Sequence, residues 1–228
     1  MSKPPRSIRT DGEATRARIL EAAGELFAAD GYAETTSKAI AARADVDVAS
    51  INYHYGSRNG LYQAVLVEAH RRVISIIDLR ALAGAGIPAT IKLEKLFEHI
   101  VERSAEDKGW NLRVLARELL APSSHLEVLL QQEVLPKFLV VKQLLSDITG
   151  IPAQDPALIR CLVSVAAPCA MLLVVGRSVP GPLRDVLQMP GATLSRHLHT
   201  FAMAGLEAVS RDYSNALPVR PHPGKRKR

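Results

Sequence analysis

The chain has 228 residues, of which 47% are hydrophobic and 23% charged, and its formal net charge is +6. This length fits one or two domains with a sizeable core, and the composition is that of a soluble globular protein. With only Cys161 and Cys169, the chain has no disulfide framework, which fits a reducing cytoplasm. The polar start has no signal-peptide core, and the apolar stretch 161–176 is too short for a confident membrane span. We interpret that stretch as a buried helix and expect no membrane partner.

The net charge sits almost entirely at the C-terminal end. Residues 1–80 carry a net +1, residues 81–219 are neutral, and residues 220–228 carry +5. Bulk charge is therefore no argument that the folded part binds nucleic acid, and such an argument must rest on local motifs. We expect residues 214–228 to be a disordered basic tail, which either adds non-specific affinity for DNA or does nothing.

The first 80 residues predict a basic arm and four helices. Residues 1–12 are expected to form a flexible basic arm. Residues 11–31 have an apolar face with helical spacing that Gly31 ends, and Thr36 can cap a short second helix. A turn of about three residues leads to a third helix that ends near residue 55, and a long fourth helix follows over 56–79. Two short helices joined by so short a turn are typical of a helix-turn-helix, here at about 36–55.

The remainder also predicts helices, over 88–108, 110–122, 123–150, 155–179 and 191–213, which makes about nine in an all-α protein. Pro136 predicts a kink inside 123–150, and Gly150 with Pro152 breaks the chain there. No segment has the period-2 alternation of a strand. A second, helical domain is expected over 80–213.

The third predicted helix, within "DVASINYHYGSR", divides its side chains among three directions. Ile51 and Tyr55 lie four residues apart and are expected to face the first helix. Small side chains and an amide on the outer face allow a close approach to a DNA major groove, where asparagine pairs with adenine and apolar groups touch the thymine methyl. The base-facing candidates are Val48, Ala49 and Asn52. The phosphate-facing candidates are Ser50, Tyr53, His54 and Arg58.

The segment over about 13–73 resembles the DNA-binding domain of TetR-family transcriptional regulators. The resemblance rests on "RILEAAGELFAADGY", "TTSKAIAARA" and "INYHYGSRNGLYQAV" taken together. Farther along, "LARELLAPSSHLEVLLQQEVLPKF" is similar to the C-terminal domain of CerR-type regulators. The family pattern implies a phosphate contact for Ser37 and a base-edge contact for Lys38, next to Thr36. It supports the roles given above to the third helix and implies a DNA-backbone contact for Arg58.

Two positions depart from the family pattern. Asp45 stands where the turn usually has glycine, and aspartate tolerates the left-handed conformation better than most residues. Asn52 stands where tyrosine is usual, so an operator sequence cannot be borrowed from a well-known member. Other readings stay open: Tyr53 can pack rather than bind phosphate, and His54 lacks the partners that a metal site or a nucleophilic triad needs.

The resemblance implies that the second domain binds an effector and dimerises. Small and apolar residues on the last two helices would let them pair with those of a second copy, although they can also pack within the monomer. Candidate effector residues are Leu93, Phe97, Ile100, Trp110, Val114, Arg117, Phe138 and Met171, with His99 and Arg113 as further polar candidates. Their apolar character indicates a small hydrophobic or amphipathic effector. For Cys161 and Cys169 the interpretation is buried small residues, with an intersubunit redox pairing as the alternative.

The function expected from this reading is a cytoplasmic, homodimeric regulator of transcription that binds double-stranded DNA and needs no cofactor. A repressor released from a pseudo-palindromic operator by its effector is the first hypothesis, and an activator is a variant of it. An all-α enzyme is disfavoured because the sequence has no zinc, di-iron or phosphate-loop motif. A helical protein-binding adaptor is the third alternative.

Overall fold

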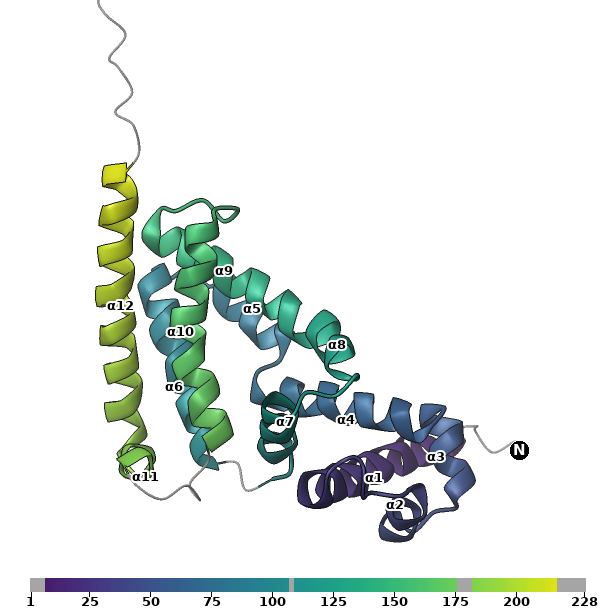
Figure 1. Ribbon diagram of the computed structural model, residues 1–228. Helices are drawn as coiled ribbons and strands as arrows, with labels where there is room; N and C mark the ends of the chain where they lie inside the picture. Colours follow the sequence, from purple (N-terminus) through teal and green to yellow (C-terminus); the bar gives the residue numbers. More distant parts are fainter. Residues whose placement is uncertain (1–6, 107–108, 176–181, 217–228) are drawn as a thin grey trace, which may run out of the picture.

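The computed structural model describes residues 7–106, 109–175 and 182–216, and every described element is helical (Figure 1). The all-α expectation is confirmed. The DNA-binding half comprises α1 (Ser7–Asp30), α2 (Ser37–Ala44), α3 (Val48–Tyr55) and α4 (Arg58–Val73). The remaining elements are α5 (Ile76–Gly84), α6 (Ala89–Glu106), α7 (Asn111–Leu120), α8 (Leu126–Leu129), the π-helical η1 (Leu130–Val134), α9 (Leu135–Thr149), α10 (Pro156–Val175), α11 (Pro182–Leu187) and α12 (Gly191–Ala216).

Each of the nine expected helices is present, and α5 and α11 are additional short ones. The fourth predicted helix is interrupted, because α4 ends at Val73 and Ser75 caps a new helix by accepting a hydrogen bond from the Asp78 backbone N–H at 3.0 Å. Residues 7–12, expected in the flexible arm, belong to α1, and residues 214–216, expected in the tail, belong to α12. The rest of the arm and tail lie outside the described residues.

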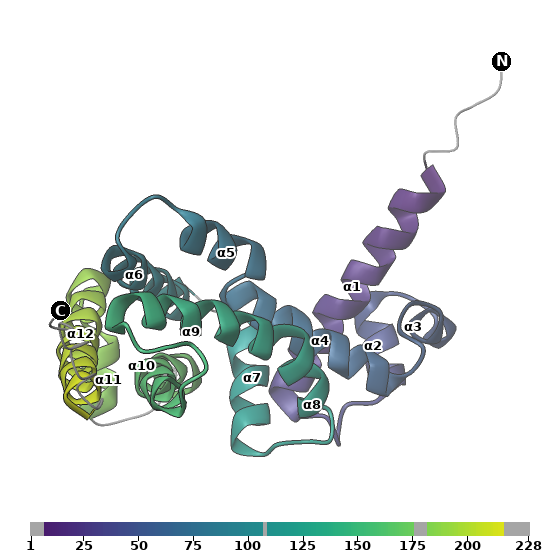
Figure 2. The same ribbon diagram turned by 90° about the horizontal axis from the view of Figure 1, so that it is seen from above.

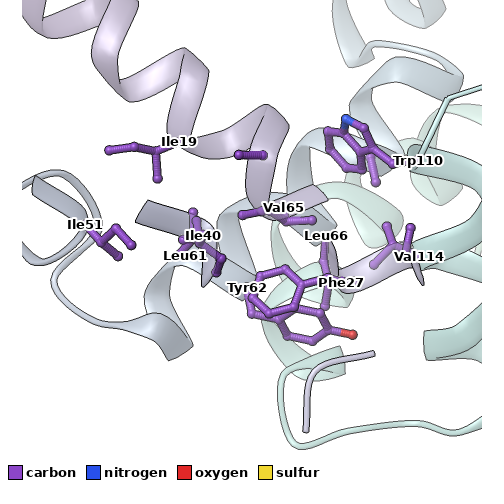
Figure 3. Close-up of a cluster of buried hydrophobic side chains, with 14 of the residues drawn as sticks. Ile19, Phe27, Ile40, Ile51, Leu61, Tyr62, Val65, Leu66, Trp110 and Val114 are labelled. Carbon is purple, nitrogen blue, oxygen red and sulfur yellow. The ribbon is translucent and has the colours of Figure 1, made fainter. Parts of the chain in front are cut away.

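Two buried clusters hold the fold together, and they do not follow the expected boundary near residue 80. The first core unites α1 to α4 with three side chains of α7, α8 and the turn before α7: Trp110, Val114 and Leu129. Figure 3 shows Trp110 and Val114 beside Leu66 and Phe27 of that core. The second core is formed by α5, α6, α9, α10 and α12. α7 and α8 therefore share a core with the DNA-binding helices, although α7 also packs against α10. Figures 1 and 2 show α7 and α8 between the two ends of the molecule.

α10 is by length and composition apolar enough to cross a membrane, with a mean hydropathy of 1.9 over Pro156–Leu173. In the structure one side of it is part of the second core, where Leu158, Leu162 and Val165 are buried, and it packs against α6, α7, α9 and α12. Part of its apolar surface remains exposed, at Ile159, Val163 and Met171. The expectation of a buried helix is therefore right for one face of α10 only.

The two cysteines are free and buried in the second core. Burial raises the pKa of the Cys161 thiol and raises that of Cys169 to about 12. Because the thiolate is the reactive form, both side chains are poor redox partners, which supports the reading of buried small residues over an intersubunit disulfide.

His70 is a partly buried histidine near the C-terminal end of α4. Its Nδ1 lies 2.9 Å from the Nζ of Lys137, whose ammonium also pairs with Glu133 at 2.6 Å. Burial, and secondarily the charge of Lys137, lower the pKa of His70 to about 4, so the folded protein holds it neutral where an unfolded chain would protonate it.

We therefore expect His70 to make the protein less stable in mild acid. As the pH falls below about 6.5, His70 becomes protonated in the unfolded state, whereas in the folded state it stays neutral until about pH 4. The free energy of unfolding should fall across this window, measured by urea denaturation at a series of pH values. In His70→Asn, which keeps an acceptor for Lys137, the fall should be shallower; an equal slope in both proteins would contradict the assignment.

Candidate nucleic-acid interface

The helix-turn-helix is set by local hydrogen bonds that the sequence encodes. Thr36 caps α2, with its hydroxyl oxygen accepting from the Ala39 backbone N–H at 3.1 Å. Asp45 ends α2 at φ 52° and ψ 58°, and no other non-glycine residue in the described part of the chain has a positive φ. The Val46 N–H then bonds to the Ala41 carbonyl at 3.0 Å and closes the turn into α3. The expectation that aspartate holds the turn in the left-handed conformation is confirmed.

Replacing Asp45 with glycine should stabilise the protein, because glycine adopts this conformation without the steric cost that a Cβ brings. We expect the free energy of unfolding to rise by about 0.5–1 kcal/mol. Urea denaturation measures it, with Asp45→Ala as the matched comparison that should lose stability. A glycine variant no more stable than the alanine variant would contradict the argument.

α3 presents the arrangement that its pattern predicts. Ile51 is fully buried in the first core, and the Tyr55 hydroxyl donates to the Arg16 carbonyl of α1 at 2.7 Å. The opposite face is open: Val48 is 42% exposed, Tyr53 is 85% exposed, and Asn52 is exposed between them. The inward anchoring of α3 on α1 therefore fixes which side chains it offers to a partner.

The other predicted DNA-contacting residues of α2 and α3 are at least partly open to solvent. Thr36, Lys38 and Ala49 are exposed, whereas Ser37, Ser50 and His54 are partly exposed. The Tyr53 and His54 rings meet edge to face with centroids 4.9 Å apart, and this contact orients both side chains on the surface.

Arg58 has structural partners that the family pattern does not imply. Its Nη1 donates to the Thr35 carbonyl at 2.6 Å and to the Tyr32 carbonyl at 3.2 Å, and its guanidinium lies 4.3 Å from the Tyr32 ring centroid. Arg58 is partly buried by these contacts. Its side chain therefore holds the loop between α1 and α2 against α4, and any contact to a DNA backbone would come in addition.

The structure does not bring the eight candidate effector residues together. Trp110 and Val114 are buried in the first core, while Leu93 and Phe97 are buried in the second, with Ile100 packed against it. Phe138 and Met171 are exposed at 39% and 51%. In the described residues these side chains do not line one cavity, because they are divided between two cores and the surface.

Arg117 links α7 to the C-terminal end of α1, where the two halves of the chain meet. Its guanidinium donates to the carbonyls of Ala28 and Ala29 at 2.9 and 2.6 Å, where α1 ends. Next to it, the buried Glu118 carboxylate accepts a 2.9 Å hydrogen bond from the Tyr62 hydroxyl of α4 and a 2.8 Å one from Ser123. Sequence reasoning missed this joint, since no local pattern pairs residues some 56 to 89 positions apart.

A groove of about 700 Å³ lies between α5 and α9. This volume is in the range of small-molecule sites. Its walls are mostly aliphatic, including Leu135, Leu139 and Val140, and its polar residues include Arg80 and Asp147. None of the eight candidate effector residues lines it.

A second apolar surface runs along α10 and α12. Phe201 is 74% exposed, and Ile159, Val163 and Val209 are exposed as well. A shallow cavity of about 170 Å³ between the two helices includes Phe201, Gly205 and Val209. An exposed apolar strip of this kind marks a surface for association.

Two known protein families match different parts of this chain. Residues 19–65 match the family described as "Bacterial regulatory proteins, tetR family", and residues 89–209 match "HTH-type transcriptional dual regulator CecR, C-terminal domain". The second match covers more than half of the chain. It confirms the expected resemblance of the C-terminal half, and the family it identifies is CecR, which is the family meant by CerR above.

Curated relatives align over part of their length. The HTH-type transcriptional repressor Rv3405c of Mycobacterium tuberculosis is 33% identical over 115 residues, which are 50% of this chain and 52% of that protein. The HTH-type transcriptional regulator UidR of Escherichia coli is 29% identical over 69 residues, 30% of this chain and 35% of that one. The chain thus spans only a third to a half of the length of these relatives.

Solved structures share the fold over nearly the whole chain. The fatty acid degradation regulator FadR from Bacillus halodurans superposes with a TM-score of 0.66 at 15% identity, covering 90% of this chain and 98% of that one. FadR from Bacillus subtilis, solved in complex with stearoyl-CoA, gives 0.63 at 15% identity and covers 83% and 98%. With its helix-turn-helix and its C-terminal half both matched, this chain belongs to the TetR family of DNA-binding transcriptional regulators, which are not enzymes, and carries a CecR-type C-terminal domain.

Proposed function

We propose that the protein is a homodimeric repressor in the cytoplasm that binds a pseudo-palindromic operator and leaves it when a small amphipathic molecule binds. The observation that carries the DNA-binding part is the open face of α3, where Val48, Asn52 and Tyr53 are exposed while Ile51 anchors the helix. We assign base contacts to Lys38, Val48, Ala49 and Asn52, and phosphate contacts to Thr36, Ser37, Ser50, Tyr53, His54 and Arg58.

Dimerisation is supported by the apolar strip on α10 and α12. Two copies related by a twofold axis would bury Phe201 and Val163, which are exposed to solvent in the monomer. The two α3 helices of such a dimer would enter successive major grooves, about 34–36 Å apart along the DNA.

The effector proposal rests on the groove between α5 and α9. Its aliphatic walls fit an acyl or similar chain, and Arg80 at its polar edge fits an acidic head group. The FadR neighbour bound to stearoyl-CoA is an example of this fold holding an acyl ligand, and Rv3405c is an example of a repressor. The CecR family is described as a dual regulator, so activation is the second candidate for the sign of regulation.

Selection of bound sequences from a random DNA library tests the whole proposal. We expect two inverted half-sites about one helical turn apart, bound by a dimer in analytical ultracentrifugation. Fluorescence anisotropy of the selected operator, titrated with fatty acids and acyl-CoAs of increasing chain length, then tests release. A failure to enrich any sequence would reject specific DNA binding, while a single half-site would reject the dimer. Unchanged operator affinity with every acyl compound would reject this effector class.

A further inference from the structure

The two cores are joined by a helical rod whose middle is not α-helical. α8, η1 and α9 run without a break over residues 126–149. Leu126 and Leu129 pack in or against the first core, whereas Leu144 and Leu145 are buried in the second. The rod therefore passes from the DNA-binding core to the other core, and the change takes place at η1.

The π-helical geometry of η1 has a cause in the sequence. Pro136 has no backbone N–H, and in an α-helix its ring would clash with the carbonyl of Gln132. The chain instead forms the wider turn, in which the Leu135 N–H bonds to the Leu130 carbonyl five residues back. Such a turn contains one extra residue and is a common site of bending within helices. At the position where Pro136 predicts a kink, the chain therefore forms a π-helical segment.

A second link between the cores lies at the C-terminal end of α4. The last carbonyls of a helix have no partner within it and carry its negative dipole end. Here they face donors from the second half of the chain. Arg103 of α6 donates to the Arg72 carbonyl at 2.7 Å, His99 Nε2 lies 2.9 Å from the Val73 carbonyl, and Lys137 of α9 donates to the His70 carbonyl at 3.3 Å. We call these three side chains the α4 clamp.

Cavities lie on both sides of the rod at the same level. The α5–α9 groove is lined by Gln131 of η1 together with Leu135 and Pro136. A second cavity, of about 300 Å³, lies against α1 and α4 and is lined by Gln132 of η1 and by Val128. η1 is therefore bounded by the proposed effector groove on one side and by a gap beside the DNA-binding helices on the other, so it has room to change shape.

We propose that η1 is the hinge of the protein, and that the DNA-binding core, with α7 and α8 attached, turns about it as one body while the α4 clamp sets the resting position. An effector in the α5–α9 groove would act directly on η1 through Gln131, Leu135 and Pro136. α7 and α8 would move with the DNA-binding helices, because Trp110, Val114 and Leu129 are part of that core, and the side of α7 that packs against α10 would slide over that helix. This inference rests on the proposed function and specifies how its site is regulated.

Hydrogen exchange of the full-length dimer tests the hinge without knowledge of the effector. Coupling is reciprocal, so operator binding must shift the same equilibrium that an effector shifts. With the operator selected from the random library, we expect exchange in peptides covering 126–140 to slow by about threefold or more, besides the direct protection of α2 and α3. Peptides within 157–165 of α10 serve as the reference inside the second core and should not change.

The outcomes separate the hinge from the proposed function. If no DNA is selected, the proposed function itself fails. If α2 and α3 are protected while peptides 126–140 exchange as before, DNA binding stands and the hinge is rejected. Equal slowing over α10 and η1 would also reject it, because the whole chain would then stiffen.

Removing the extra residue of the π turn gives a second test. Deletion of Gln132 together with Pro136→Ala should turn α8, η1 and α9 into one α-helix with both ends in their original register. This variant should bind the operator within about threefold of the wild type but lose the DNA-induced slowing at 126–140. Pro136→Ala alone, which keeps the extra residue, is the control. Retention of the slowing in the deletion variant would reject the hinge, and if the variant does not fold by circular dichroism the wild-type exchange data decide.

The α4 clamp is tested by Lys137→Met, with Lys142→Met on the same helix as the matched control. Loss of the buried ammonium should speed exchange in peptides covering 66–73 by about threefold or more, and it should change the operator affinity. The control should change neither. Equal behaviour of the two variants would show that Lys137 does not set the resting position.

Discussion

Replacing Asn52 with alanine should weaken binding to the selected operator by roughly thirtyfold or more. An asparagine that pairs with adenine in the major groove contributes about 1–3 kcal/mol of discrimination, and a dimer loses this contact in both half-sites. The fold should not suffer, because Asn52 is exposed on α3 and the helix is anchored by Ile51 and Tyr55. Fluorescence anisotropy with the operator measures the loss, and thermal unfolding verifies that stability is unchanged.

Tyr53→Phe is the matched control within the same helix. Removing its hydroxyl takes away a contact to phosphate, which should weaken binding to all DNA sequences alike. Asn52→Ala should instead relax the preference at one position of each half-site and leave the affinity for unrelated DNA unchanged. If Asn52→Ala bound operator and unrelated DNA with the wild-type ratio, the assignment of Asn52 to a base contact would be wrong.

The parts of the site that could be predicted are those that depend on neighbouring residues. The left-handed Asp45, the cap at Thr36 and the division of α3 into buried and open faces all follow from spacings of a few residues. The break between α4 and α5 was also readable, because Ser75 and Asp78 form a capping pair of the kind that begins a helix. The helix-compatible sequence on both sides of Ser75 nevertheless favours one continuous helix over 56–79.

The parts that could not be predicted depend on which distant helices meet. Trp110 is among the residues whose apolar character suggests the lining of an effector cavity. In the structure its indole N–H donates to Glu21 of α1 at 2.8 Å and Arg72 lies 4.8 Å above its ring. An apolar residue suited to a ligand cavity is equally suited to a core, and periodicity cannot tell the two apart. The same ambiguity applies to Val114, Leu93 and Phe97, which also lie in the two cores.

Gly24→Ala should lower the free energy of unfolding by about 1–3 kcal/mol, although alanine is the better helix former. A Cβ at Gly24 would lie 2.3 Å from two carbons of the Trp110 indole, closer than side chains approach one another. The indole is held by Glu21, by Arg72 and by the first core, so relieving the clash means shifting α7 against α1. Urea denaturation followed by circular dichroism and by Trp110 emission measures the effect.

Gly12→Ala, in the same helix, separates this clash from helix propensity. A Cβ at Gly12 meets nothing within 4 Å, so the variant should gain about 0.5–1 kcal/mol from propensity alone. If Gly24→Ala were as stable as Gly12→Ala, then α7 would not be packed tightly on α1. That result would also detach α7 from the DNA-binding core and remove the reason to treat the two as one moving body. A loss of stability confined to Gly24→Ala, with a shift in Trp110 emission, would instead place the joint between the two halves of the chain at this indole.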